Sequence, residues 1–257
     1  MQTFARLSAA ATLSIALTVG GAVPAQAYTE QEQWELQVGQ QEYQQLQGKI
    51  VPPSSPLYSK LGPIAKRIKR VADHQYFVPF HFILVNDNSP NAFSVPGGNV
   101  YVTTSMMSFA QNKEELAGVL CHEVSHDIHH DVYNLYRKNQ NLSLIAGLAG
   151  MLVGNSAIGQ MVVGTGAQLE SLSFSRPVES AADHTGAYIC AEAGSNPWGM
   201  VWLFKRFQGS QQQAPPMEML SDHPADNHRI TDLENEFRND PATFGRFNPN
   251  PSSGTPL

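Results

Sequence analysis

Two histidines four residues apart, with a glutamate beside the first, are the residues of this chain best suited to chemistry. They lie in the run His122-Glu123-Val124-Ser125-His126, inside an apolar stretch that predicts a helix. On a helix, residues four apart lie on one face about one turn apart, so both imidazoles can bind one metal ion. Glu123 is close enough to act as a base toward a water at that ion. The spacing therefore predicts a metal site with its own catalytic carboxylate.

A catalytic zinc site needs a third protein ligand and an open position, and H-E-x-x-H is the pattern that zinc-dependent peptidases use to begin such a site. Glu179, at the start of a predicted helix, is the best candidate for that ligand. Asp183 stands four residues later on the same face, where its carboxylate can accept the outer N–H of a ligating histidine. Such a contact changes metal affinity or activity by about 10–100-fold. The E-x-x-x-D spacing thus supplies a ligand together with support for a neighbouring ligand.

Two later residues are further candidates, each with more than one interpretation. His223 precedes Pro224 in an Asp- and Pro-rich loop. It can reach the site as a catalytic oxyanion donor, occupy the open position of the metal in a resting state, or be an ordinary surface histidine. Arg229 can orient that loop, pair with a carboxylate such as Asp183, or form a plain surface salt bridge.

A second histidine pair repeats the four-residue spacing. His126 and His130 are four apart, with Asp127 in the position of the base. Asp reaches less far than Glu, so the first register is favoured, and it is also the one that matches the family resemblance described below. We therefore expect His129 and His130 at the solvated C-terminal end of the helix, where the helix dipole favours them.

The predicted elements are mostly amphipathic helices with two short strands, which indicates a mainly helical α+β fold. A capping box of Thr29 and Glu32 begins the first helix, and Asn112 with Glu115 caps the helix that carries H-E-x-x-H. Further helices are expected over residues 57–71, 178–193, 198–207 and 226–238, and strands over residues 80–85 and 99–103. The expected architecture is one domain with a small β-sheet beside the metal-binding helix.

Composition favours one well-filled domain and argues against nucleic acid as a partner. The chain has 257 residues, of which 42% are hydrophobic and 15% charged, and its formal net charge is -6. Its two basic pairs, Lys66-Arg67 and Lys69-Arg70, fall on a predicted helix with its own apolar stripe. This pattern predicts no basic surface for a phosphate backbone.

The first 27 residues are interpreted as a signal peptide that is cleaved after Ala27. Arg6 precedes an apolar stretch that ends in Ala25-Gln26-Ala27, a small-x-small cleavage pattern. A membrane anchor is the alternative. We therefore expect a periplasmic or secreted protein with a zinc metallopeptidase domain over residues 28–240 and a disordered tail over residues 241–257.

The run over residues 142–164 has no charged residue and is long enough to cross a bilayer. Glycines and the pair Asn155-Ser156 interrupt it. Two short packed helices, or an apolar flap over the cleft, are therefore favoured over a membrane span. Peripheral contact with a membrane is a further alternative.

The two cysteines, Cys121 and Cys190, allow one disulfide in an oxidising compartment. Cys121, however, adjoins a metal ligand, and both positions have the pattern of buried helix residues. We expect free, buried thiols with no function of their own.

Several motifs in a fixed order carry a resemblance to one group of gluzincin peptidases. They are H-E-x-x-H, Glu179-x-x-Ala182-Asp183-x-x-Gly186, the upstream Asn91-Ala92-Phe93 and Pro96-Gly97-Gly98, and the downstream His223-Pro224 with Arg229. Together they resemble the family that contains the CAAX prenyl protease, HtpX and the periplasmic BepA-like peptidases, over roughly residues 29–238. The resemblance implies a zincin fold, one Zn2+ per chain held by His122, His126 and Glu179, and a base at Glu123. From this sequence we expect neither the flanking transmembrane helices of some members nor the repeat-rich C-terminal domain of the BepA-like proteins.

These expectations combine into a zinc metalloendopeptidase in which Glu123 takes a proton from the attacking water and passes it to the leaving amine. The resemblance and the predicted export imply unfolded or misassembled envelope proteins as substrates, and hence protein quality control. The strand over Asn99 to Thr103 is expected to pair with an extended substrate. A chaperone-like assembly factor with a latent zinc site is the alternative. A purely structural zinc site is disfavoured, because it would recruit a fourth protein ligand and has no use for Glu123.

Overall fold

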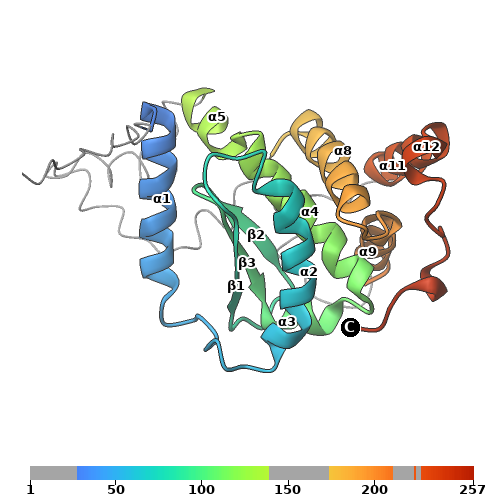
Figure 1. Ribbon diagram of the computed structural model, residues 1–257, viewed down its shortest axis with the longest axis horizontal. Helices are drawn as coiled ribbons and strands as arrows, with labels where there is room; N and C mark the ends of the chain where they lie inside the picture. The colour runs from blue at the N-terminus through green and yellow to red at the C-terminus, as the bar shows by residue number, and fades with distance from the viewer. Residues whose placement is uncertain (1–27, 139–173, 211–222, 224–226) are drawn as a thin grey trace, which may run out of the picture.

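A three-stranded sheet lies between one helix on one face and two helices on the other in the computed structural model, which describes residues 28–138, 174–210, 223 and 227–257 (Figure 1). The prediction of a mainly helical α+β fold is confirmed. The predicted signal peptide and the apolar run over residues 142–164 lie outside the described residues. No helix in the described part of the chain combines the length and the apolar character that a bilayer crossing requires.

The described helices are α1 Glu30–Leu46, α2 Leu57–Ala72, α3 Thr104–Phe109, α4 Lys113–Ile128, α5 Asp131–Lys138, α8 Arg176–Glu192, α9 Trp198–Ser210, α11 Asn227–Asn239 and α12 Pro241–Phe244, with the short 3-10 helix η1 Pro251–Ser253. The strands are β1 His81–Val85, β2 Ala92–Val95 and β3 Asn99–Thr103. Every predicted helix and strand among these residues is present, whereas β2, α3, α5, α12 and η1 were not predicted.

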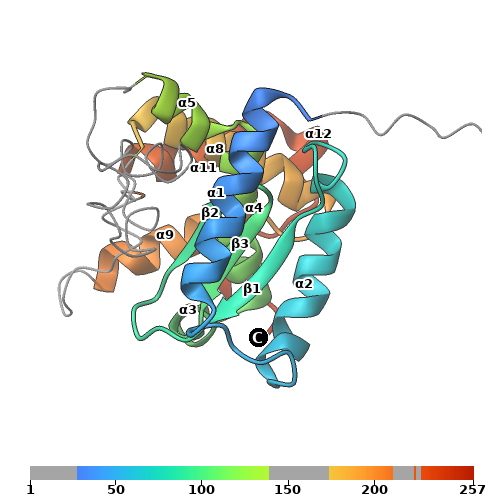
Figure 2. The same cartoon turned by 90° about the vertical axis from the view of Figure 1, so that its left-hand side faces the viewer.

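The sheet has the order β1-β3-β2, so β3 is its central strand. β3 runs parallel to β1 and antiparallel to β2, with Phe93 opposite Tyr101. Because side chains alternate between the faces of a strand, each strand serves two separate apolar layers. One layer packs under α1 and contains Trp34, Val38, Val85, Phe93, Val95 and Tyr101. The other packs against α2 and α4 and contains Leu84, Ala92, Val100 and Val102. Figure 2 shows α1 crossing the first face of the sheet.

The central helix α4 is fixed at its start by polar contacts. Asn112 caps it as predicted, since its side chain accepts a 2.8 Å hydrogen bond from the Glu115 backbone N–H. The Glu115 carboxylate is fully buried and accepts hydrogen bonds from the Arg206 guanidinium on α9 and from the Gln111 N–H. α9 also crosses α4 with almost no space between the backbones, because a Cβ at Gly199 would lie 2.1 Å from the Glu114 carbonyl oxygen. These contacts fix both the beginning and the position of the helix that carries H-E-x-x-H.

The prediction of a disordered tail over residues 241–257 is wrong. Residues 241–244 form α12, and the chain then passes over α9, where the Trp202 indole donates a 2.9 Å hydrogen bond to the Pro249 carbonyl. Its last residues reach the start of α4, where the Thr255 N–H and hydroxyl both donate to the Glu114 carboxylate. A segment rich in Pro, Asn, Ser and Gly predicts disorder, but here these residues form turns that follow a folded surface.

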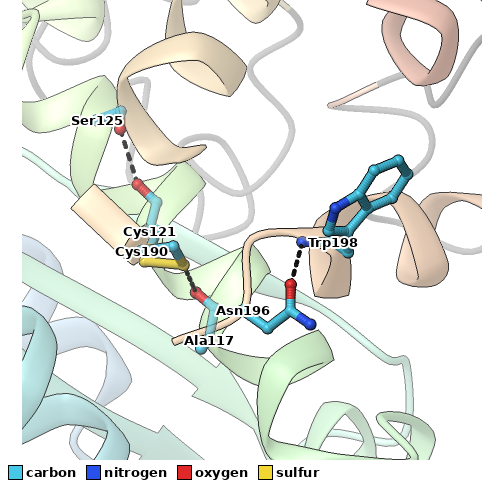
Figure 3. Close-up of a disulfide and its surroundings, with 6 residues drawn as sticks. All are labelled: Ala117, Cys121, Ser125, Cys190, Asn196 and Trp198. Carbon is cyan, nitrogen blue, oxygen red and sulfur yellow. Dashed lines mark hydrogen bonds between the residues drawn. A yellow bond between two sulfur atoms is a disulfide. The ribbon is translucent and has the colours of Figure 1, made fainter. Parts of the chain in front are cut away.

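The expectation of free thiols is also wrong. Cys121 on α4 and Cys190 on α8 form a disulfide between residues 69 positions apart, with Cα atoms 5.9 Å from each other (Figure 3). Both half-cystines are fully buried. The sequence pattern correctly indicated burial, but it did not indicate that the two helices bring the sulfur atoms together. The disulfide therefore links the two helices that carry the predicted metal ligands.

Candidate metal centre

Two crossing helices present the predicted ligands. α4 carries His122, Glu123 and His126, and the first turn of α8 carries Glu179. The helices approach each other closely at Gly186, where a Cβ would lie 3.0 Å from the backbone of His122 and of the preceding residue. Only glycine lets α8 come this near, and the approach allows a carboxylate on α8 to reach two imidazoles on α4.

Four buried side chains meet at this crossing. His122, His126, Glu179 and His223 each offer one ligand atom, and these atoms all lie within 4.8 Å of one another. The Nε2 atoms of His122 and His126 are 3.1 Å apart. Glu179 Oε2 lies 3.4 Å from the first of them, and Glu179 Oε1 lies 3.8 Å from the second. Among the described residues this is the only such group of histidine, cysteine and carboxylate side chains that could hold a metal ion.

The outer nitrogens of both α4 histidines contact carboxylates. His122 Nδ1 lies 3.0 Å from Asp183 Oδ1, which is the arrangement that the E-x-x-x-D spacing predicted. His126 Nδ1 lies 2.8 Å from Asp131 Oδ2, and the sequence analysis did not identify Asp131. A carboxylate on Nδ1 favours the tautomer with the proton on Nδ1 and the lone pair on Nε2. Both Nε2 lone pairs are therefore directed into the cluster.

Arg229 joins the carboxylates of α8. Its side chain is 2% exposed and donates hydrogen bonds of 2.7 Å to both oxygens of Asp183. A further guanidinium nitrogen lies 2.8 Å from Glu179 Oε2, and the guanidinium carbon stacks 4.4 Å above the Phe204 ring. Of the open interpretations of Arg229, a surface salt bridge is wrong and pairing with Asp183 is what the structure shows.

His223 is buried in the cluster and is not a surface residue. Its Nδ1 lies 2.9 Å from Glu179 Oε1 and 3.3 Å from His122 Nε2. Its Nε2 lies 3.8 Å from Glu123 Oε1. The ring thus contacts the third and first candidate ligands at once, and from there it could offer a fourth ligand atom to a metal ion.

Glu123 is held by one oxygen only. Its Oε2 accepts a 3.1 Å hydrogen bond from the Ser94 N–H on β2, whereas its buried Oε1 has no hydrogen-bond partner among the described residues. Burial raises the pKa of Glu123, and the neighbouring imidazoles of His223 and His122 oppose this effect only in part. A buried carboxylate with one free oxygen and a raised pKa has the properties of a general base.

Comparison with known proteins agrees with this geometry. The family model for peptidase family M48 matches residues 59–237. The chain belongs to peptidase family M48. It is 34% identical to a beta-barrel assembly-enhancing protease of Yersinia pestis over 61% of this chain and 34% of that protein. It is 27% identical to the protein of the same name in Escherichia coli K12, over 88% of this chain and 51% of that protein.

A mitochondrial relative belongs to the same set. The chain is 30% identical to the mitochondrial metalloendopeptidase OMA1 of Saccharomyces cerevisiae, over 77% of this chain and 62% of that protein. The chain thus spans less than two thirds of the length of each of these curated relatives. The predicted resemblance to BepA-like metallopeptidases is confirmed.

Burial and the charges around the cluster shift the pKa values of the two α4 histidines in opposite directions. Burial alone would lower the pKa of His122, but hydrogen bonds to Asp183 and Glu179 outweigh it and raise the pKa to about 10. Burial lowers the pKa of His126, and the nearby charges of His122 and His223 lower it further. Burial likewise opposes, but does not prevent, a lowered pKa for Glu179, which is stabilised as an anion by His223 and His122. Without an ion, the cluster therefore favours a proton on His122 between two anionic carboxylates.

The expectation that β3 pairs with an extended substrate is wrong for this M48 chain. β3 is paired on both sides, with β1 and with β2, so it has no free edge. The edge next to the cluster belongs to β2, where the Ser94 N–H points away from β3 toward Glu123. Within the described ranges no strand pairs with this outer edge of β2. The sequence analysis missed β2 because its four residues follow a loop rich in Asn, Ser and Pro.

Proposed function

We propose that this chain is a zinc-dependent endopeptidase in which His122, His126 and Glu179 hold one Zn2+ and Glu123 is the general base. The observation that carries the proposal is the position of Glu123 beside the cluster. One of its oxygens is held by the Ser94 N–H, and the other is buried, has no hydrogen-bond partner among the described residues and lies 3.8 Å from His223 Nε2. A histidine and carboxylate cluster with no chemistry would have no use for such a group.

The donor set fits zinc in kind and in spacing. Imidazole nitrogen and carboxylate oxygen are common zinc ligands, and two histidines with one glutamate form a known catalytic set. A tetrahedral Zn2+ with ligand atoms at about 2.0–2.1 Å holds them about 3.3–3.4 Å from one another. The Nε2 atoms of His122 and His126 are 3.1 Å apart, Glu179 Oε2 lies 3.4 Å from the first of them, and the other Glu179 oxygen, Oε1, lies 3.8 Å from the second. The cluster is therefore close to the required size without any change in backbone.

Zinc, when bound, lowers the pKa of a water ligand from 15.7 to about 7 and polarises the scissile carbonyl. Glu123 Oε1 accepts the proton of the attacking water, because Oε2 is already engaged by the Ser94 N–H. The raised pKa of Glu123 lets the same carboxyl group later donate that proton to the leaving amine. The outer edge of β2 would bind an extended substrate by main-chain hydrogen bonds, which hold a peptide with little demand on its sequence.

The substrate class and the compartment belong to the proposal as well. Two of the relatives are named for enhancing β-barrel assembly, and a third is named a mitochondrial metalloendopeptidase. Together with the predicted signal peptide over residues 1–27, these names support unfolded or misassembled envelope proteins as substrates and a periplasmic or secreted location. Peripheral membrane contact through residues 142–164 remains part of the prediction.

A latent zinc site is the second candidate function, and His223 favours it. His223 Nδ1 lies beside the same ligand atoms that the metal would contact, so His223 can occupy the fourth position at rest. In that state the chain would act as an assembly factor until His223 moves away. The fourth ligand also removes one argument against a structural zinc site, but the free oxygen of Glu123 still favours catalysis.

The test is cleavage of an unfolded model protein by the purified chain, with metal content measured in parallel. Glu123→Gln should abolish cleavage and keep one Zn2+ per chain, whereas His122→Ala should lose both. His223→Ala should raise cleavage several-fold if His223 closes the site, with His74→Ala as the exposed control. Cleavage by Glu123→Gln at the wild-type rate would overturn the assignment of the base. Full complementation of a deletion strain by Glu123→Gln would favour the assembly factor.

A further inference from the structure

We propose that Asp131 is the positioning residue of His126, and that Glu35 and His130 hold the turn that aims Asp131 at it. The inference rests on the proposed zinc function and extends it to an element, α1, that carries no ligand. Neither α1 nor the turn between α4 and α5 belongs to the H-E-x-x-H or E-x-x-x-D motifs.

The contact between Asp131 and His126 matches the one that supports the other ligand. Asp131 Oδ2 lies 2.8 Å from His126 Nδ1, as Asp183 Oδ1 lies 3.0 Å from His122 Nδ1. Both His126 and Asp131 are buried, at 1% and 9% exposure. Each ligating imidazole thus has its own carboxylate on the nitrogen that faces away from the cluster. Without such an acceptor, His126 could place its proton on Nε2 and then would have no lone pair on the nitrogen that faces the cluster.

Asp131 reaches His126 only because the chain turns sharply after α4. Asp131 is five residues beyond His126, so on a continued helix it would point away from the face that His126 occupies. His130 makes the turn, since it adopts φ 56°, the only positive φ of a non-glycine residue in the described part of the chain. A left-handed conformation costs a residue with a Cβ about 1–2 kcal/mol, so something must hold His130 there.

Glu35 on α1 holds His130. Its Oε1 lies 2.7 Å from His130 Nδ1, and its Oε2 accepts a 2.6 Å hydrogen bond from the Tyr76 hydroxyl. The Tyr76 oxygen in turn accepts the Gly97 N–H at 3.0 Å, in the turn between β2 and β3. The Glu35 carboxylate is 1% exposed and is therefore fixed on both oxygens. His130 lies just beyond the C-terminal end of α4, as expected, but its side chain is only 33% exposed because Glu35 holds the ring.

A chain of contacts thus runs from α1 to the cluster. Glu35 fixes the His130 ring, the His130 backbone directs Asp131, and Asp131 orients His126. A structural role for Asp131 as an acidic residue in the first turn of α5 would stabilise the fold through the helix dipole. That role would not change the affinity of the folded protein for a metal, and this difference separates the two interpretations.

The experiment is a Zn2+ affinity measurement on the purified chain by competition with a chromophoric chelator, with folding checked by circular dichroism. Asp131→Asn should weaken Zn2+ binding by about 10–100-fold, while the exposed control Asp232→Asn on α11 leaves it unchanged. His130→Ala should weaken binding more than His130→Gly, because glycine adopts the left-handed turn without cost. Zn2+ affinity of folded Asp131→Asn within twofold of wild type would overturn the proposal.

A second measurement on the unmodified chain covers the case in which the variants do not fold. Long-range 1H–15N spectra of the zinc-loaded protein should show His126 protonated at Nδ1, with that proton shifted downfield by its hydrogen bond to a carboxylate. A proton on Nε2 of His126 would overturn the proposal as well. Absence of Zn2+ binding by the wild-type chain would instead contradict the proposed zinc function, so the two failures are distinguishable.

Discussion

Arg229 donates two 2.7 Å hydrogen bonds to Asp183, although the residues are 46 positions apart in the chain. The same guanidinium lies 2.8 Å from Glu179 Oε2. Burial would raise the pKa of Asp183, but the Arg229 cation outweighs burial and lowers it. One cation from α11 therefore keeps Asp183, the support of His122, ionised inside the protein and also contacts the candidate ligand Glu179.

Replacing Arg229 should destabilise the fold strongly. Arg229→Leu leaves two buried carboxylates without their cation, and breaking a buried pair in this way costs about 3–5 kcal/mol of unfolding free energy. Arg238→Leu is the control, because Arg238 is 58% exposed and its pair with Glu234 is worth about 0–1 kcal/mol. Urea unfolding of the metal-free proteins measures both. Equal midpoints for the two variants would contradict the proposed role of Arg229.

Two glycines of α9 should respond to alanine in opposite ways. At Gly199 a Cβ would meet the Glu114 backbone at 2.1 Å, so Gly199→Ala must push α9 away from α4 and should cost about 3 kcal/mol. At Gly209 an added Cβ would meet no other part of the described structure within 4 Å, so Gly209→Ala should be neutral or stabilising by up to about 1 kcal/mol. Thermal unfolding of both variants tests this. Similar melting temperatures of the two variants would show that α9 and α4 pack less closely than the structure indicates.

Loss of the disulfide should lower stability without removing the cluster. The double variant Cys121→Ala/Cys190→Ala opens a loop between residues 69 positions apart and should lose about 2–4 kcal/mol of unfolding free energy. A reducing agent should destabilise the wild type and leave the double variant unchanged. Mass spectrometry with a thiol-reactive reagent counts the bonded cysteines. Two reactive thiols in the unfolded, unreduced wild type would contradict the disulfide.

The Glu35 and His130 pair should make stability depend on pH. The hydrogen bond to Glu35 raises the pKa of His130, which means that the folded state binds the proton more tightly than the unfolded state. This contribution is complete below the unfolded pKa of about 6.5 and is lost as the pH rises through the folded value. Between about pH 5.5 and about pH 8.5, the unfolding free energy should therefore decrease more in the wild type than in His130→Gln. An equal fall would mean that other groups carry the dependence.

The sequence predicted the elements better than it predicted their partners. The spacing of His122 and His126, and of Glu179 and Asp183, depends on helix periodicity, which is a local property. Asp131 and the Glu35 contact with His130 could not be predicted in the same way. They depend on a left-handed turn at a residue other than glycine and on a helix 95 positions away in the chain. The disulfide was missed for a similar reason, since it requires knowledge of how α4 and α8 cross.

The predictions for the edge strand β2 and for the C-terminal segment over residues 241–257 were wrong for a different reason. Both contain the Asn, Ser, Pro and Gly residues that local rules assign to loops or to disorder. Their conformation comes from tertiary partners, as when Glu114 accepts the N–H and the hydroxyl of Thr255. Composition reflects the local conformational preference of such residues, and it contains no information about the surface onto which they pack.

The close crossing at Gly186 has a consequence for metal uptake. α4 and α8 touch through their backbones there and are bonded at Cys121 and Cys190, so their relative position is set when the protein folds. The backbone positions of the candidate ligands on α4 and α8 are therefore already fixed before a metal ion binds. The conformational entropy of assembling the site is thus lost during folding and not during binding. Chelation should accordingly empty a preorganised site whose backbone stays in place.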